Sequence, residues 1–84
     1  MTSILAANLS KISYLEQTLF IDCAQGNVSI DKLETGQFYV EHPYFPNIRR
    51  MFNPNEVDQL IGFLGPIKSI MMLDHDLDEE IWLY

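Results

Sequence analysis

The sequence predicts a small α+β domain in which a long N-terminal helix and a second helix pack on a three-stranded, mainly antiparallel sheet. Two observations indicate the helices: apolar residues recur at helical spacing in the first third, and residues 53–66 carry both a start and a stop signal. The sheet is indicated by three short segments rich in β-branched, aromatic and aliphatic residues. The 84 residues are 48% hydrophobic and 20% charged, which predicts a single globular domain spanning residues 1–84.

The N-terminal third of the chain is predicted to form an amphipathic helix. Thr2 or Ser3 can cap its start, and Gly26 stands where a left-handed residue would end it. Glu16 interrupts the apolar stripe, and we interpret it as an edge residue that reaches water, as a sign that the helix ends near it, or as a contact for a cation on a partner. The stripe consists of Leu5, Leu9, Ile12, Leu19, Phe20 and Cys23.

The end of this segment has a second interpretation. "TLFIDC" also fits a β-strand that turns at Gly26-Asn27 into another strand, "VSID", because Gly-Asn is a hairpin signal. The helix is preferred because Leu15, Leu19 and Cys23 keep a four-residue step. The sequence leaves the conformation of residues 18–30 open between these two forms.

The middle of the chain is predicted to contain one strand between irregular segments. "SIDKLETG" resembles a short helical turn with Ser29 as its cap and Gly36 as its stop. "QFYVEH" alternates in polarity and predicts a strand that ends at Pro43. The prolines of "HPYFPNIRRMFNP" exclude a continuous helix or a central strand, so this segment is predicted to be a surface loop.

The second helix is the best-defined element. Asn53 is placed to cap it, Pro54 suits its first position, and Glu56 can complete a capping box. Gly65-Pro66 predicts its end. The residues spaced to face the core are Val57, Leu60, Ile61 and Leu64.

Two strands are predicted to follow this helix as a hairpin. "IKSIMML" has the apolar character of a central strand, and "EIWLY" alternates as its antiparallel partner. "DHDLDE" would connect the two. Alternation places Trp82 and Tyr84 on one face, so one apolar pair points away from the helices unless something covers it.

Charge placement restricts the class of partner. The net charge is −7, and residues 74–80 hold five of the twelve acids, whereas residues 1–73 carry a net charge of only −2. Five bases give little capacity to neutralise phosphates, so direct nucleic-acid binding is disfavoured, and a protein partner with a basic surface is expected.

No segment has the roughly 20 apolar residues of a membrane span. With a single cysteine and no recognisable leader, the chain is expected to be a soluble cytoplasmic protein.

The acidic run "DHDLDEE" resembles the first half of a calcium loop. Asp74, Asp76 and Asp78 fit ligand positions 1, 3 and 5, but Glu79 occupies position 6, where a glycine is needed, and position 12 falls beyond Tyr84. No specific metal site is therefore predicted, and weak binding of a divalent cation by the alternating carboxylates stays open.

Catalysis is also not expected. The only groups available to Cys23 as a base are two histidines, and no phosphate loop or hydrolase motif is present. We predict a protein without enzymatic activity and without a cofactor.

Three segments are candidates for partner binding. The 44–52 loop combines aromatic residues with arginines and the C-terminus is aromatic, and such residues are enriched in interface hot spots. Residues 74–80 are acidic, and clustered charge steers the encounter with an oppositely charged surface. The alternative for the loop is that its aromatic residues pack inward as a lid. The predicted partner-binding residues are Tyr44, Phe45, Arg49, Arg50, Asp74, Asp76, Asp78, Glu79, Glu80, Trp82 and Tyr84.

These features predict a small acidic, non-catalytic protein that binds and modulates a larger protein or complex, as an inhibitor or adaptor. One alternative is a homodimeric assembly protein that pairs its N-terminal helices across the stripe containing Glu16. Another is an acidic mimic of nucleic acid that occludes a DNA-binding protein. The clustering of the acids in one segment counts against the mimic.

Overall fold

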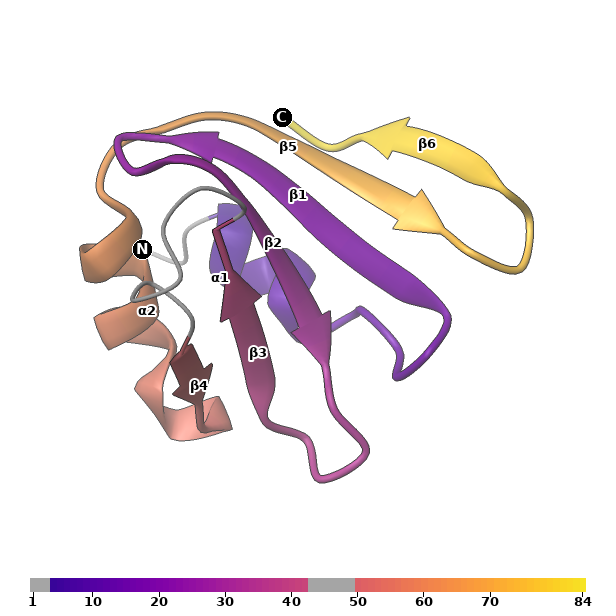
Figure 1. The fold of residues 1–84 in the computed structure, drawn as a ribbon, viewed down its shortest axis with the longest axis horizontal. Helices are drawn as coiled ribbons and strands as arrows, with labels where there is room; N and C mark the ends of the chain where they lie inside the picture. Colours follow the sequence, from indigo (N-terminus) through magenta and orange to yellow (C-terminus); the bar gives the residue numbers. More distant parts are fainter. Residues whose placement is uncertain (1–3, 43–49) are drawn as a thin grey trace.

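A computed structural model describes residues 4–42 and 50–84 of the chain. One antiparallel sheet of six strands, in the order β4-β3-β2-β1-β5-β6, dominates the described residues (Figure 1). The elements in chain order are α1 (Ile4–Leu9), β1 (Gln17–Cys23), β2 (Gly26–Lys32), β3 (Phe38–Glu41), β4 (Arg50–Phe52), the 3₁₀ turn η2 (Pro54–Glu56), α2 (Val57–Leu64), β5 (Ile67–Asp74) and β6 (Glu79–Trp82).

The predicted fold class, a long N-terminal helix over a three-stranded sheet, is wrong. Helix α1 spans only six residues, and β1 pairs with β2 as an antiparallel hairpin, which is the second interpretation of this segment. Leu19, Ile21 and Cys23 alternate with outward-facing residues and are buried. Gly26 provides the turn with a positive φ of 92°, where a side chain would be strained. The chain is therefore mostly sheet with short helices.

The predicted helical turn over "SIDKLETG" is also wrong. Ser29 lies within β2, whose buried residues Val28 and Ile30 alternate with polar ones, so this segment has the strand period of two. The Gly36 N–H donates to the Leu33 carbonyl at 2.9 Å and closes a turn into β3. The strand predicted from "QFYVEH" is confirmed as β3.

The second helix is confirmed. The Asn53 N–H donates to Glu56 Oε1 at 2.8 Å, Pro54 begins η2, and Leu60 and Leu64 of α2 are fully buried. Gly65 ends the helix with its N–H donating to the Ile61 carbonyl at 3.2 Å.

The C-terminal hairpin is confirmed as well. Strand β5 lies between β1 and β6, and β6 pairs with it in the register Met71–Trp82 and Asp74–Glu79. Strand β6 is the last strand in the sheet order, so the sheet ends there in the described part of the chain.

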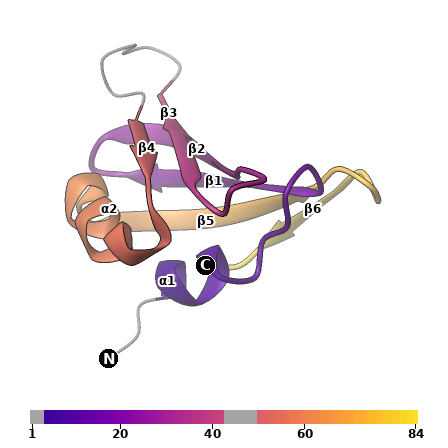
Figure 2. The same ribbon diagram turned by 90° about the horizontal axis from the view of Figure 1, so that it is seen from below.

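The core lies between the helices and one face of the sheet. Figure 2 shows α1 and α2 on the same side of the strands, so neither helix covers the opposite face, which we call the outer face. This one-sided cover allows the outer face to carry exposed and polar side chains. The buried apolar residues of the core are Leu5, Leu9, Ile12, Leu19, Ile21, Cys23, Val28, Ile30, Phe38, Val40, Phe52, Leu60, Leu64 and Ile70.

Candidate functional site

The acidic turn between β5 and β6 is held in a fixed conformation. Asp74 Oδ1 accepts the backbone N–H groups of Asp76 and Leu77, each at 3.1 Å, as an aspartate does in a turn. Asp74 Oδ2 accepts a hydrogen bond from Gln17 Nε2 at 3.3 Å. Asp78 takes a left-handed conformation with φ of 52°, which aspartate tolerates better than most residues. The turn thus presents its remaining acids from a defined backbone.

His75 ties this turn to the rest of the sheet. Its backbone N–H donates to the Glu16 carbonyl at 2.7 Å, and its Nε2 lies 2.8 Å from Thr18 Oγ1. The Thr18 hydroxyl donates to Asp31, so it has only lone pairs to offer the imidazole, and His75 must be the donor at Nε2. A histidine that donates to this hydroxyl does not act as its base, so Asp31, Thr18 and His75 form an anchor here.

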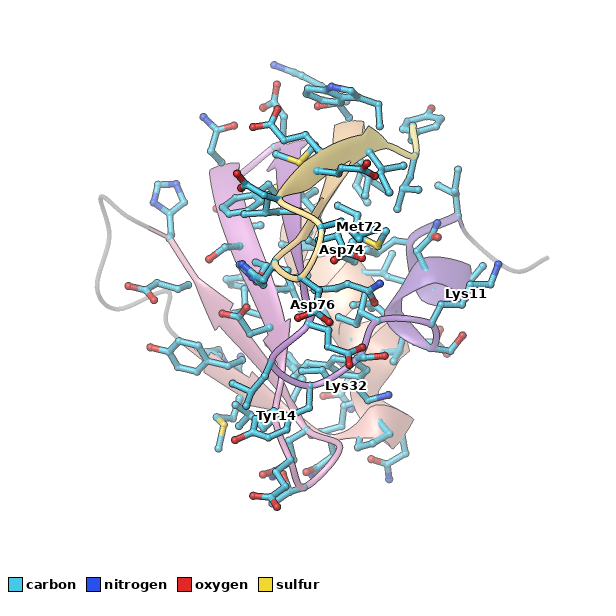
Figure 3. All side chains as sticks on the ribbon, turned by 90° about the vertical axis from the view of Figure 1, so that its right-hand side faces the viewer. Lys11, Tyr14, Lys32, Met72, Asp74 and Asp76 are labelled. Atoms are coloured by element: carbon cyan, nitrogen blue, oxygen red, sulfur yellow. The ribbon has the colours of Figure 1, made fainter. Side chains whose placement is uncertain are left out.

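The hydrogen bonds to Asp74 change its protonation. The Leu77 N–H is the largest cause, and the Gln17 amide adds to it, so that the pKa of the Asp74 carboxyl is lowered from its ordinary value. The carboxylate is therefore ionised throughout the neutral range, which is the form that holds the turn. Figure 3 faces this turn and shows Asp74 and Asp76 near the centre of the view.

The predicted C-terminal contact residues lie on the exposed edge of the sheet. All four residues of β6, Glu79 to Trp82, are exposed, and Trp82 retains 66% of its accessible surface. Tyr84 is 61% exposed, although its backbone N–H still donates to the Ile70 carbonyl at 3.2 Å. The structure therefore brings the acidic turn, Trp82 and Tyr84 together on one hairpin.

The predicted contact loop is only partly described, and the prediction of a loop is wrong for its last three residues, which form strand β4 beside β3. Tyr44, Phe45 and Arg49 lie outside the described residues. Arg50 is exposed in β4, with its guanidinium carbon 4.9 Å from the centre of the Phe52 ring, and Phe52 itself is buried. Because β4 and β6 are opposite edges of the sheet, Arg50 does not join the acidic hairpin in one site.

The outer face holds a depression that the sequence did not reveal. The strand registers place Trp82, Met71, Phe20, Ser29 and Glu41 in one row across five strands. This row passes through a depression of about 420 Å³, where Phe20 stays 39% exposed. The depression is also lined by Ile21, Asp22, Asn27, Val28 and Ser69.

The sequence did not predict this depression because Phe20 was assigned to a helix. In a helix, Phe20 falls on the same stripe as Leu19, whereas in β1 the two side chains point to opposite faces. The signal that could have found it is the alternation of "GNVSIDK", which identifies a strand beside "TLFIDC".

Cys23 is part of the core. Its thiol is buried and donates to the Gly26 carbonyl at 3.4 Å. Burial raises the pKa of this thiol, so the reactive thiolate is disfavoured. His42 is also buried and lies close to Gly26: a Cβ added at Gly26 would be 2.9 Å from His42 Nε2.

The described residues hold neither a metal-binding cluster nor a membrane-spanning helix. Within 4–42 and 50–84, no group of three or more histidine, cysteine, aspartate or glutamate side chains is arranged to hold a metal ion. In the same part of the chain, no helix has the length and apolar character required to cross a bilayer.

Comparison of the chain with protein-family models, curated proteins and solved structures finds no match.

Proposed function

We propose that this protein is a non-catalytic binding protein, and that its acidic β5–β6 hairpin docks on a basic surface of a larger protein and modulates it. The single observation that carries the proposal is the anchored acidic turn on the exposed edge hairpin. Asp76, Asp78, Glu79 and Glu80 are all exposed there, next to Trp82. Clustered charge steers encounter with an oppositely charged surface, and an exposed aromatic supplies affinity after contact.

The anchoring of the turn supports this role. Binding through a mobile acidic tail costs conformational entropy, because the tail must be ordered in the complex. Here the hydrogen bonds of Asp74 and His75 fix the backbone before any partner arrives. The open edge of β6 adds backbone groups that an extended segment can pair with.

A charge-neutral turn variant tests the proposal. We expect Asp76→Asn with Asp78→Asn to retain the fold, because both side chains are exposed and asparagine also tolerates the left-handed conformation of Asp78. Asp74 is left unchanged, because its carboxylate holds the turn. The matched control removes two exposed acids elsewhere, Glu34→Gln with Asp58→Asn.

The measurement is capture from a native lysate on immobilised protein, followed by association kinetics of a captured protein at two salt concentrations. The proposal predicts that the turn variant loses a protein that the wild type and the control both retain. Its association rate should fall several-fold and depend less on salt, because fewer charges steer the encounter. Equal retention and equal rates for the turn variant and the control would contradict the proposal.

The two alternative functions stay predictions. The homodimer was expected to pair long N-terminal helices, and that helix is replaced by the β1–β2 hairpin, with Glu16 in the preceding turn. Light scattering over a concentration series tests a dimer formed by another surface. Competition with DNA for a captured partner tests the mimic of nucleic acid.

A further inference from the structure

The outer-face depression shares Trp82 with the acidic hairpin, but it extends across β5, β1, β2 and β3 and its lining is mainly apolar. Its floor is apolar and aromatic, formed mainly by Phe20 and Met71 with Trp82 at its β6 side. Neither helix reaches this face, as Figure 2 shows, so the floor is open to solvent among the described residues. Apolar surface that is hollowed and rimmed by polar groups is typical of a binding site.

The charge of the outer face indicates which kind of partner can bind there. The registers place Asp22, Asp31, Glu41 and Glu80 on the outer face, and the exposed Lys68 stands at the irregularity of β5 next to Ser69. Asp22 and Glu41 are the charged residues of the depression itself. An occupant therefore meets apolar surface in the middle and carboxylates at the rim.

A second copy of this chain does not fit the depression. Two copies face to face would set the acids of one outer face against those of the other, and like charges brought together disfavour association. The net charge of −7 acts in the same direction. A cationic partner has the opposite effect, since its charges complement the rim.

We infer that the outer-face depression binds a polypeptide segment of a partner protein in which lysine or arginine residues alternate with aliphatic residues. The aliphatic side chains pack on Phe20 and Met71 and remove their exposed surface from water. A cationic head reaches the Asp22 carboxylate at the rim, and another can lie over the exposed Trp82 ring. The inference rests on the proposed function only in that both use a cationic protein partner.

Three synthetic heptapeptides separate the two contributions: KLKLKLK has charge and aliphatic groups, KSKSKSK has the same charge without aliphatic groups, and SLSLSLS has aliphatic groups without charge. Trp82 is the only tryptophan of the chain and belongs to both the depression and the acidic hairpin, so its emission reports binding at either, and the variants below distinguish the two. Binding of KLKLKLK should shift the emission to shorter wavelength and protect Trp82 from acrylamide quenching. Calorimetry of the same mixtures gives the affinity.

We expect KLKLKLK to bind the full chain at least about tenfold more tightly than either comparison peptide. Phe20→Ser should weaken binding about tenfold, because it removes the floor. Leu15→Ser, which changes a leucine that is exposed elsewhere, should leave binding unchanged. Asp22→Asn should weaken binding about threefold and keep the fold, whereas Asp58→Asn should have no effect.

The results that overturn the inference are specific. Equal binding of KSKSKSK and KLKLKLK, or wild-type affinity in both Phe20→Ser and Asp22→Asn, excludes the depression as the site. Absence of KLKLKLK binding to the wild type excludes it as well. If Phe20→Ser loses the peptide while Asp76→Asn with Asp78→Asn keeps every captured protein, the inference stands and the hairpin proposal fails. If Phe20→Ser keeps the peptide while Asp76→Asn with Asp78→Asn loses a captured protein, the hairpin proposal stands and the inference fails.

Discussion

At the residue scale, single contacts decide which backbone conformations this small domain tolerates. Gly26 combines a left-handed φ with a close neighbour, the buried His42 ring. Gly62 lies on the exposed side of α2, where an added Cβ would meet no neighbouring atom within 4 Å. The same substitution therefore has opposite consequences at the two sites.

Gly26→Ala is expected to destabilise the fold by about 2 kcal/mol, from backbone strain and from displacement of His42. Gly62→Ala is the matched control and should stabilise the fold by about 0.5–1 kcal/mol, because alanine is the better helix former. Urea denaturation followed by circular dichroism measures both. A Gly26→Ala variant as stable as the wild type would refute the role given to this turn.

Asp74 makes the stability of the hairpin depend on pH. Its pKa is lower in the folded chain than in the unfolded chain, so its contribution is complete above the unfolded value and is lost as pH falls through the folded value. Wild type should exceed Asp74→Asn in urea midpoint at pH 7, and the difference should shrink as pH falls below about 4. Asp58→Asn serves as the control. A difference that is constant from pH 7 to pH 2 would show that the carboxylate charge has no part in holding the turn.

At the element scale, the sequence predicts the helix of residues 53–64 and the C-terminal hairpin, whereas it leaves the N-terminal hairpin as the second of two interpretations. The first two carry local signals, namely Asn53-Pro54 with Glu56 for the helix and alternation in "EIWLY" for the strand. In β1, the four-residue step from Leu19 to Cys23 fits both periods, because four is two strand repeats and nearly one helical turn. Pairing with β2 and β5 decides the outcome, and those contacts are distant in sequence.

The candidate site was predictable to a similar extent. Acid clustering follows from composition, and alternation puts Trp82 and Tyr84 on one face but does not decide whether that face is exposed; the structure shows Trp82 exposed on the same hairpin as the acids. The outer-face depression depends on the register of Phe20 with Met71 and Ser29. The alternation of "GNVSIDK" indicates the strand that carries Ser29, but the pairing with Met71 joins residues that are far apart in the chain. Sheet registers, unlike helix caps, join residues whose separation along the chain is large.

Strand β6 also illustrates how an edge is protected from pairing with its own copies. Glu79 and Glu80 place two charges on its exposed edge, which is a common defence against edge-to-edge association. Glu79→Thr with Glu80→Thr should promote concentration-dependent self-association, because it leaves an uncharged strand with high β-propensity.

Sedimentation velocity over a concentration series measures this self-association. The control is Glu79→Lys with Glu80→Lys, which keeps two charges of the other sign on the same positions and should sediment as the wild type does. Unchanged sedimentation of the threonine variant would mean that these carboxylates do not protect the edge.

At the scale of the whole molecule, the strand order separates the recognition surfaces from the core. The helices bury one face, and the other face and the β6 edge carry Phe20, Trp82 and a large share of the acids. Polar substitutions on the outer face are therefore expected to cost little stability, so binding variants can be made without unfolding the domain.

The central position of β1 has a consequence for synthesis of the chain. This strand needs β2, which follows it at once, and β5, which is translated about fifty residues later, so contacts of high sequence separation complete the sheet. A nascent chain that has reached only β3 has an uncovered β1 edge and no α2 over its apolar face. Ribosome-bound chains of increasing length should thus gain protease resistance in one late step, when residues 67–74 have left the exit tunnel.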